Sequence, residues 1–267
     1  MSNTKIALVT GASSGFGQLT AARLAVSDYR VFGTSRKEQT SSAPGVEMLV
    51  LDVRSDESVH ACVAELLQRA GRIDLLVNNA GQTHASLAEE TDPAQARDVL
   101  ETNFWGAVRV TNAVLPTMRK QRGGHIINVS SLAGLLGTPG QAFYSASKFA
   151  LEGYSEALSI ELQPFNIHVS LIEPGFFTTG LHASTAPSDR QIPDYDGLRS
   201  AIETSVQQSI AQGGDPQAVA EAIVRAAVNK APKLRYRVGS DAVWVPRIKA
   251  IVPGSMFSAR MRKRFGL

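Results

Sequence analysis

The segment Thr10–Gly17, which reads TGASSGFG, lies between an apolar run at residues 5–9 and a stretch with helical spacing. Glycines at such a strand-to-helix junction allow a tight turn and let backbone N–H groups approach a phosphate. We expect Gly11 to make the turn, Gly15 to admit a pyrophosphate, and Gly17 to let the helix pack closely on the sheet. The Gly-x3-Gly-x-Gly spacing is a variant of the dinucleotide-binding fingerprint, so a plain turn is the alternative interpretation.

Strand-length apolar runs alternate with helical stretches along the rest of the chain. The runs are almost continuously apolar, which is typical of parallel strands covered on both faces. The pattern predicts an α/β fold: one doubly wound Rossmann domain over residues 1–267, with a parallel seven-stranded sheet and helices on both faces. The expected strands are 6–9, 30–34, 47–51, 73–77, 125–129, 167–172 and 235–238, and the expected helices are 15–26, 57–70, 94–118, 141–163 and 216–229.

Two regions fall outside this alternation. Residues 175–214 are expected to form a long irregular segment, rich in Thr, Ser, Pro and Gly, and its length favours a substrate lid over a passive connection. Residues 240–267 form a basic C-terminal extension; from Lys230 to the end there are ten Lys or Arg residues and a single acid. This extension is interpreted as a lid, a membrane-surface contact or a subunit contact, and these alternatives stay open.

The composition excludes several other classes of protein. Charged residues make up 19% of the 267 residues and hydrophobic residues 43%, a globular balance. The single cysteine, Cys62, rules out an internal disulfide, and no histidine spacing indicates a metal site. We find no nucleic-acid reading motif, no integral membrane segment and no signal peptide, and therefore expect a cytoplasmic protein.

Seven short motifs occur in the order that is typical of the short-chain dehydrogenase/reductase family, which the chain resembles clearly over about residues 5–180. They are TGASSGFG at 10–17, LDV at 51–53, NNAG at 78–81, ETNFWG around Asn103, INVSS at 127–131, YSASK at 144–148 and EPG at 173–175. Weaker similarity near the C-terminus points to the hydroxysteroid and retinol dehydrogenase branch. The resemblance implies an oxidoreductase that forms a homodimer or homotetramer.

Tyr144 and Lys148 are four residues apart, so they project from one face of the expected helix. A neighbouring ammonium group and a positive nicotinamide ring favour phenolate, which would lower the pKa of Tyr144 and allow it to exchange a proton with a substrate oxygen. Ser131, at the end of a strand, would hydrogen-bond the same oxygen. By the family resemblance, Asn103 holds a water that links Lys148 to solvent; the alternative is a buried amide that satisfies helix backbone.

The cofactor is expected to be NADP. The second strand is followed by Ser35 and Arg36 with no acid until Glu38, whereas an acid there would bind the ribose of NAD and repel the 2′-phosphate of NADP. Arg36 offers a guanidinium fork to this phosphate, and Ser13 adds a hydroxyl group. Besides these residues, the resemblance implies a cofactor site made of Gly11, Ser14, Gly15, Phe16, Gly17, Asp52, Val53, Asn79, Ala80, Gly81, Tyr144, Lys148, Pro174, Gly175, Phe177 and Thr179.

The expected substrate is a lipophilic ketone or aldehyde, or the matching alcohol, because the segments after the motifs are apolar. The expected walls are Leu132, Leu135, Leu136, Phe143, Phe176, Phe177 and Leu181. The main alternative function is a non-catalytic NADP-sensing protein of the same fold. A sugar-nucleotide epimerase is disfavoured by the short C-terminal region, and a serine hydrolase by the lack of a Gly-x-Ser-x-Gly elbow.

Overall fold

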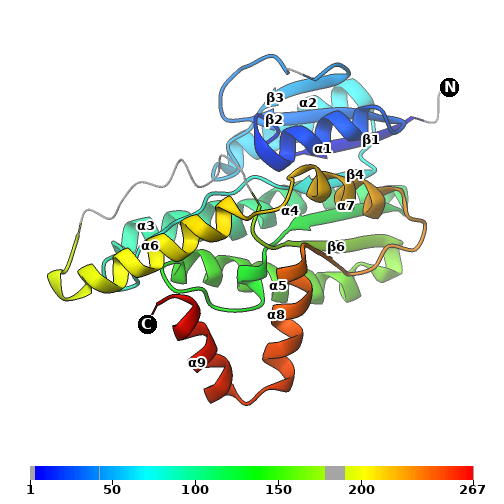
Figure 1. Cartoon of the computed structure of the whole chain (residues 1–267). Helices are drawn as coiled ribbons and strands as arrows, with labels where there is room; N and C mark the ends of the chain where they lie inside the picture. Colours follow the sequence, from blue (N-terminus) through cyan, green and yellow to red (C-terminus); the bar gives the residue numbers. More distant parts are fainter. Residues whose placement is uncertain (1–3, 42, 178–189, 267) are drawn as a thin grey trace.

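The computed structural model of the chain describes residues 4–41, 43–177 and 190–266. Seven parallel strands form one sheet in the order β3-β2-β1-β4-β5-β6-β7 (Figure 1). They are β1 (Lys5–Val9), β2 (Tyr29–Ser35), β3 (Val46–Val50), β4 (Leu75–Asn78), β5 (Gly124–Val129), β6 (Ile167–Pro174) and β7 (Arg235–Val238). The predicted doubly wound Rossmann fold is confirmed.

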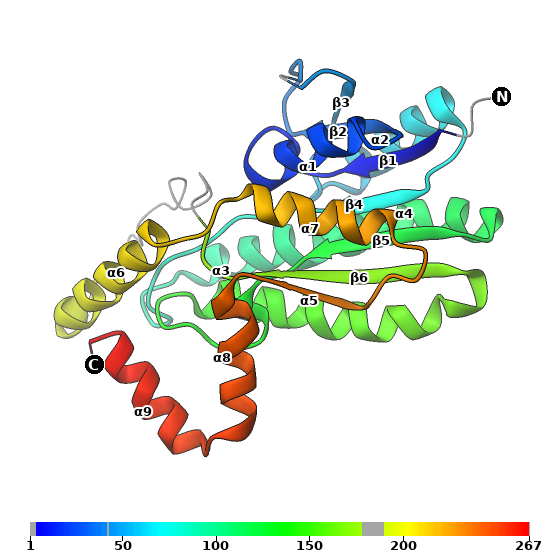
Figure 2. The ribbon, with the colours of Figure 1, turned by 45° about the vertical axis from the view of Figure 1, so that its right-hand side comes forward.

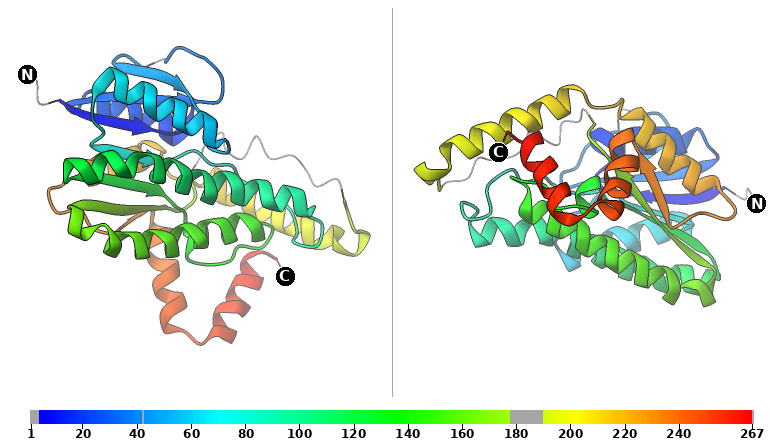
Figure 3. Two further views of the ribbon diagram at one scale, coloured as in Figure 1. Left: turned by 180° about the vertical axis from the view of Figure 1, so that it is seen from behind. Right: turned by 60° about the horizontal axis from the view of Figure 1, so that its bottom comes forward.

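Alternate residues of the strands enter two separate cores. On β1, Ile6 and Leu8 belong to one hydrophobic cluster and Ala7 and Val9 to the other. Such a strand is buried on both faces, which explains its continuous apolar sequence. The first core packs under α2 (Asp56–Ala70), α4 (Gly106–Gln121) and α5 (Ala142–Glu161), and the second under α1 (Gly15–Ala25) and α7 (Gln217–Val228) (Figures 1 and 3).

The strand order reverses direction between β1 and β4. From β1 the chain winds outward to β2 and β3, then returns to β4 and continues to β7 on the other side. A crevice forms at such a switch point beyond the carboxyl ends of the strands, and ligands of open α/β sheets bind there. The glycine segment after β1 and the NNAG segment after β4 therefore meet at this crevice, and α1 begins beside them (Figure 2).

Three elements differ from the sequence-based expectation. The helix expected over 94–118 is α3 (Pro93–Leu100), a π-helical turn (Glu101–Trp105) and then α4. The segment expected to be irregular over 175–214 contains α6 (Asp196–Ala211), so that expectation was wrong for most of the residues from 190 onward; residues 178–189 lie outside the described chain. The basic extension is a helical hairpin, α8 (Ser240–Ile251) and α9 (Gly254–Arg264), that projects below the sheet (Figure 1).

The position of α6 depends on a buried ion pair. Glu90, whose side chain is almost fully buried, pairs with Arg199 of α6 and accepts a hydrogen bond of 2.8 Å from the Ile192 N–H. A buried carboxylate is costly unless it is paired and hydrogen-bonded, and here both conditions are met. Leu198, Ile202 and Val206 recur every four residues, and this spacing was the helical signal in the sequence.

Candidate active site

The glycine segment after β1 is tightly packed at two positions and open at a third. Gly11 has φ +66°, and a Cβ there would lie 2.9 Å from the Ala80 Cα. A Cβ on Gly17 would lie only 2.2 Å from the Gly11 carbonyl oxygen. Gly15 has φ +55°, but no atom lies within 4 Å of the place a Cβ would take. The loop is thus closed against the protein at both ends and faces open space in the middle.

Asn79 and Thr10 hold this loop in place. The Asn79 side-chain amide donates hydrogen bonds to the carbonyl oxygens of Thr10 at 3.0 Å and Gly11 at 3.1 Å. The Thr10 hydroxyl oxygen accepts hydrogen bonds from the backbone N–H groups of Asn79 and Ala80, each at 3.0 Å. Asn79 of the NNAG motif therefore holds the glycine loop in place. It does so with the same side-chain amide that, by the resemblance, was expected to hold the cofactor.

The N-terminus of α1 meets the requirements of an anion site. Ser14 is its N-cap residue but makes no capping hydrogen bond with its side chain, and no acid occupies the first turn. The first N–H groups of a helix lack partners within the helix, and its dipole favours negative charge at this end. The side chains of Ser13 and Ser14 are exposed beside these groups. A pyrophosphate fits this arrangement.

The end of β2 carries a positive charge. Ser35 is buried, whereas Arg36 is exposed. The Arg36 charge acts on Asp52 and Asp98 and helps to lower the pKa of both carboxyl groups. At Asp52, partial burial is the largest single effect and raises the pKa, but the hydrogen bonds and charge of Arg54, together with the charge of Arg36, outweigh it. Val53 is buried, and its side chain packs so close to α4 that only a glycine, Gly106, fits opposite.

Ser131 and Tyr144 share one pocket. Ser131 follows β5 and caps a short 3-10 helix, where its hydroxyl oxygen accepts a hydrogen bond of 3.1 Å from the Ala133 N–H. Both side chains line this pocket, and the Ser131 hydroxyl group acts on the Tyr144 phenol to lower its pKa. The pocket around them is also lined by Phe16, Pro174, Gly175 and Phe177, all of which the sequence had assigned to the cofactor site. Phe16 and Phe177 meet edge to face at 5.9 Å between ring centroids.

Lys148 lies one turn further along α5 and is buried. Its ammonium group donates a hydrogen bond of 2.9 Å to the Val129 carbonyl oxygen and lies 5.8 Å from the centroid of the Tyr144 ring. Burial lowers the pKa of Lys148 to about 8, against an opposing effect of the Glu152 carboxylate. Lys148 thus connects the end of β5 to the helix that carries Tyr144.

The expected lowering of the Tyr144 pKa is not found in the chain by itself. Burial raises the pKa of Tyr144, and the effect of the Ser131 hydroxyl group only partly opposes this. Removal of the phenolate from water raises the pKa by more than the Ser131 hydroxyl group lowers it. The expected lowering of the Tyr144 pKa included the positive charge of a nicotinamide ring, whereas the raised pKa is that of the chain alone.

Asn103 lies in the π-helical turn and is fully engaged with the protein. Its amide nitrogen donates to the Gln82 carbonyl oxygen at 2.8 Å and to the Ser147 hydroxyl at 3.0 Å, and its oxygen accepts from the Gln82 N–H at 2.8 Å. Ser147 in turn donates to the Tyr144 carbonyl oxygen at 2.7 Å. Sequence reasoning missed Gln82 and Ser147 as supports, although Ser147 lies inside the YSASK motif.

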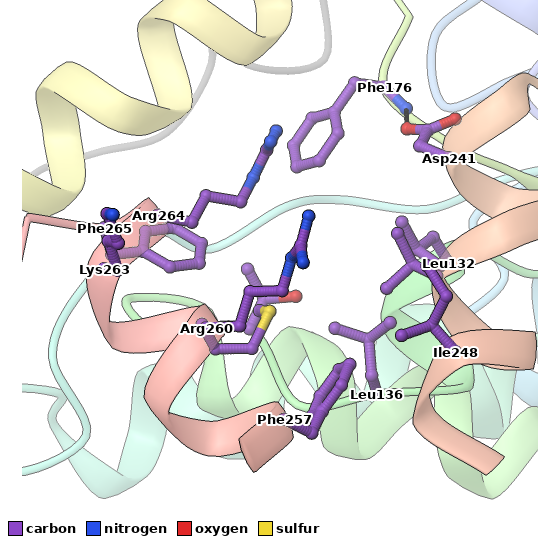
Figure 4. Close-up of a pocket in the computed structure, with 13 residues that line it drawn as sticks. Leu132, Leu136, Phe176, Asp241, Ile248, Phe257, Arg260, Lys263, Arg264 and Phe265 are labelled. Carbon is purple, nitrogen blue, oxygen red and sulfur yellow. Dashed lines mark hydrogen bonds between the residues drawn. The ribbon is translucent and has the colours of Figure 1, made fainter. Parts of the chain in front are cut away.

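Beside this pocket lies a larger cavity of about 670 Å³. Leu132, Thr138 and Phe176 line both spaces, so the cavity adjoins the pocket of Ser131 and Tyr144. Its outer wall is the α8–α9 hairpin, which contributes Val245, Ile248, Phe257 and Met261. Figure 4 shows Ile248 and Phe257 on this wall. Of the residues expected as substrate walls, Leu132, Leu136 and Phe176 line this cavity, whereas Leu135 and Phe143 do not, and Phe177 lines only the smaller pocket. Thr179 and Leu181 lie outside the described residues.

The comparison with known proteins agrees with this geometry. The family model described as short chain dehydrogenase matches residues 5–190, and the chain therefore belongs to the short-chain dehydrogenase family of oxidoreductases. A 3-ketodihydrosphingosine reductase of Bacteroides thetaiotaomicron is 40% identical over 97% of both chains. Retinol dehydrogenase 8 of Bos taurus is 37% identical over 94% of this chain and 86% of its own length.

Solved structures show the same fold with either nicotinamide cofactor. A short-chain dehydrogenase from Streptomyces avermitilis has 37% identity and a TM-score of 0.83, covering 97% of this chain and 94% of its own. ElxO with bound NADP has 25% identity and a TM-score of 0.75 over 90% and 99% of the two chains. A short-chain dehydrogenase from Burkholderia phymatum in complex with NAD has 24% identity and a TM-score of 0.81 over 93% and 94%, which shows the fold alone.

Two further observations concern the described part of the chain. None of its helices is long and apolar enough to cross a membrane. Within the same residues, no group of three or more His, Cys, Asp or Glu side chains could hold a metal ion.

Proposed function

We propose that this protein is an NADP-dependent oxidoreductase that interconverts a lipophilic ketone or aldehyde with its alcohol. The observation that carries the proposal is that Ser131 and Tyr144 line one pocket, with the Lys148 ammonium group 5.8 Å from the centroid of the Tyr144 ring. A sensing protein needs the glycine loop, but it has no use for a proton donor held in this way.

In the direction of reduction, Tyr144 donates its phenolic proton to the carbonyl oxygen of the substrate. The Ser131 hydroxyl hydrogen-bonds the same oxygen, positions the carbonyl group and stabilises the charge that develops on it. The Lys148 ammonium favours the phenolate left on Tyr144. A nicotinamide cofactor, when bound, supplies the hydride. In the oxidation direction Tyr144 accepts the proton of the alcohol.

Two parts of the chain support NADP as the cofactor. The open space at Gly15 and the uncapped start of α1 suit the pyrophosphate. At the end of β2, the exposed Arg36 and the absence of an acid at residues 35–37 suit a 2′-phosphate, because a guanidinium group pairs with phosphate oxygens. Asn79 would act by holding the glycine loop.

The substrate is proposed to be lipophilic because the cavity beside the pocket is lined mainly by apolar side chains. Its volume of about 670 Å³ falls within the range of roughly 300–1,000 Å³ of sites for small organic ligands. The two named relatives add support, since sphingoid and retinoid molecules both contain long hydrocarbon parts.

The proposal is tested by following NADPH oxidation with dodecanal, a methyl ketone of similar length and retinal. We expect turnover by the natural chain and a loss of about 100-fold or more in kcat/KM for Tyr144→Phe, with unchanged affinity for NADPH. Tyr236→Phe is the matched control, because this half-buried tyrosine lies on β7, outside the pocket. NADPH binding without turnover of any of these compounds would favour the sensing protein instead.

We also propose a homodimer or homotetramer that associates through α4 and α5. Trp105, Phe149 and Ile160, on or next to these helices, are large apolar side chains left exposed. Analytical ultracentrifugation of the natural chain and of Ile160→Lys tests this, because a monomeric natural chain contradicts the proposal.

A further inference from the structure

The cavity beside Ser131 and Tyr144 is not uniformly apolar. Its inner part is made of Leu132, Leu136 and Phe176, next to the candidate active site. Its other side carries Arg260, Lys263 and Arg264, all from α9. Arg260 and Arg264 are one helical turn apart, and both extend from α9 toward Phe176 (Figure 4). The cavity therefore combines apolar side chains from both of its walls with cations that come only from α9.

These cations lack an acidic partner among the residues that line the cavity. The single acid in the lining is Asp241, and its carboxylate already accepts hydrogen bonds from the N–H groups of Phe176 at 2.7 Å and Ala242 at 2.9 Å. Arg264 donates to the Ser209 hydroxyl of α6 at 3.1 Å, a neutral partner. Arg260 has no hydrogen bond or ion pair with the described residues. Its charge is left for a ligand or for water.

A second feature separates these residues from an ordinary solvated basic face. Arg262 lies on the same helix but does not line the cavity, whereas Arg260, Lys263 and Arg264 do, together with Phe257 and Met261. The three cations thus share a helix face with apolar side chains that line the same cavity. Apolar walls with a few convergent polar groups are characteristic of sites that orient an amphiphilic ligand.

We propose that this cavity binds a single-chain amphiphile with an acidic group. Its hydrocarbon part packs between Leu136, Phe257 and Met261, and its carboxylate or phosphate pairs with Arg260, while Arg264 and Lys263 add positive charge. The inference rests on the proposed function, which places the reacting carbonyl group at Ser131 and Tyr144. It narrows the substrate class to keto or hydroxy derivatives of acidic lipids and disfavours amine-bearing chains such as sphingoid bases.

The test measures binding to the full chain, without turnover, of three probes with the same hydrocarbon length: dodecanoate, dodecanol and dodecylamine. Displacement of an environment-sensitive fluorescent lipid gives the three affinities. We expect dodecanoate to bind about fivefold tighter than dodecanol and dodecylamine to bind more weakly than dodecanol, because a partly exposed ion pair contributes modestly. Raising the salt concentration should reduce the preference for the acid.

Variants locate the effect. Arg260→Gln should lower the affinity for dodecanoate to that for dodecanol and leave dodecanol binding unchanged. Arg262→Gln, the matched control on the outer face of α9, should still bind dodecanoate more tightly than dodecanol. Val245→Trp, which fills the cavity from α8, should weaken the binding of both probes. Equal affinities for the acid and the amine overturn the proposal, and so does an Arg262→Gln effect as large as that of Arg260→Gln.

The binding test of the acidic amphiphile and the turnover test of the proposed function can fail independently of each other. If the chain turns over dodecanal but binds dodecanoate no more tightly than dodecanol, only the proposal of an acidic amphiphile is contradicted. If the chain prefers dodecanoate, this preference depends on Arg260, and no carbonyl compound is turned over with NADPH, only the proposed oxidoreductase function is contradicted.

Discussion

The backbone N–H of Phe176 donates a hydrogen bond of 2.7 Å to the side-chain carboxylate of Asp241. Phe176 follows β6 and lines the candidate active site, whereas Asp241 lies in the first turn of α8. The same carboxylate fills the space next to Gly175, where a Cβ would lie 1.9 Å from Oδ1. The EPG motif and the C-terminal hairpin are therefore joined by one side chain.

Asp241→Ala should weaken this connection. The Phe176 N–H loses its partner, which costs about 1–3 kcal/mol in the free energy of unfolding when the group stays buried. Because the hairpin forms one wall of the large cavity, we also expect a higher KM for dodecanal and an unchanged affinity for NADPH. Urea unfolding and steady-state kinetics measure these effects. Asp194→Ala, at an exposed position, is the control, and equal stability of the two variants would contradict the assigned role.

Gly17→Ala should disturb the glycine loop. A Cβ at this position would lie 2.2 Å from the Gly11 carbonyl oxygen and 2.4 Å from the Asn79 amide nitrogen, so the start of α1 must move. We expect a lower melting temperature and at least a tenfold loss of NADPH affinity, corresponding to about 1.4 kcal/mol. Titration of NADPH fluorescence and thermal unfolding measure the two effects.

Gly153→Ala is the matched control for this prediction. Gly153 is also a helical glycine, but nothing lies within 4 Å of its added Cβ. Alanine is a better helix former by about 1 kcal/mol, so this variant should be as stable as the natural chain or more stable. Should Gly17→Ala bind NADPH as tightly as Gly153→Ala does, the close packing at residue 17 would not matter for the cofactor.

The sheet could be predicted from sequence because its signals are local. Each strand is a short apolar run, and the turn after β1 needs the positive φ of Gly11 and Gly15, which non-glycine residues rarely adopt. The boundaries of α2 also follow from local chemistry, since Ser55 caps its start and Gly71 ends it in a left-handed conformation. The ends of the strands differ from the predicted ranges by no more than two residues.

The remaining features depend on contacts between distant residues. Asn103, in the π-helical turn, hydrogen-bonds Gln82 and Ser147, contacts that no local pattern reveals. The large cavity exists because α8 and α9 fold back over Leu132 and Leu136. The raised pKa of Tyr144 reflects burial, which the spacing of Tyr144 and Lys148 does not encode. Burial, unlike helical periodicity, is a property of the assembled chain.

Arg36→Ala should change the preference between the two nicotinamide cofactors. Without the guanidinium group, the 2′-phosphate of NADPH loses a charge-assisted hydrogen bond worth about 1.5–3 kcal/mol, whereas NADH has no phosphate at this position. We expect kcat/KM for NADPH to fall about tenfold or more and that for NADH to change little. Lys37→Ala is the control at the neighbouring exposed position. A parallel fall with both cofactors would show that Arg36 does not read the phosphate.

Glu152, on α5 one turn after Lys148, should make stability depend on pH. Burial raises the pKa of Glu152 from 4.5 to about 7; Glu173 contributes in the same direction, and Ser130 and Arg235 oppose it. The folded chain therefore holds a proton on this carboxyl group between about pH 4.5 and 7, whereas the unfolded chain has released it. The resulting stabilisation is full below about pH 4.5 and is lost as the pH rises through about 7.

Glu152→Gln removes this titration, because an amide carries no charge at either pH. The free energy of unfolding of the variant, relative to the natural chain, should therefore be higher at about pH 8 than at about pH 4, by up to roughly 3 kcal/mol. Urea unfolding at both pH values measures the difference. Glu156→Gln is the control, because Glu156 also pairs with Arg235, at 3.0 Å, but is exposed. The same pH dependence in both variants would mean that the pairing with Arg235, and not the burial of Glu152, controls this titration.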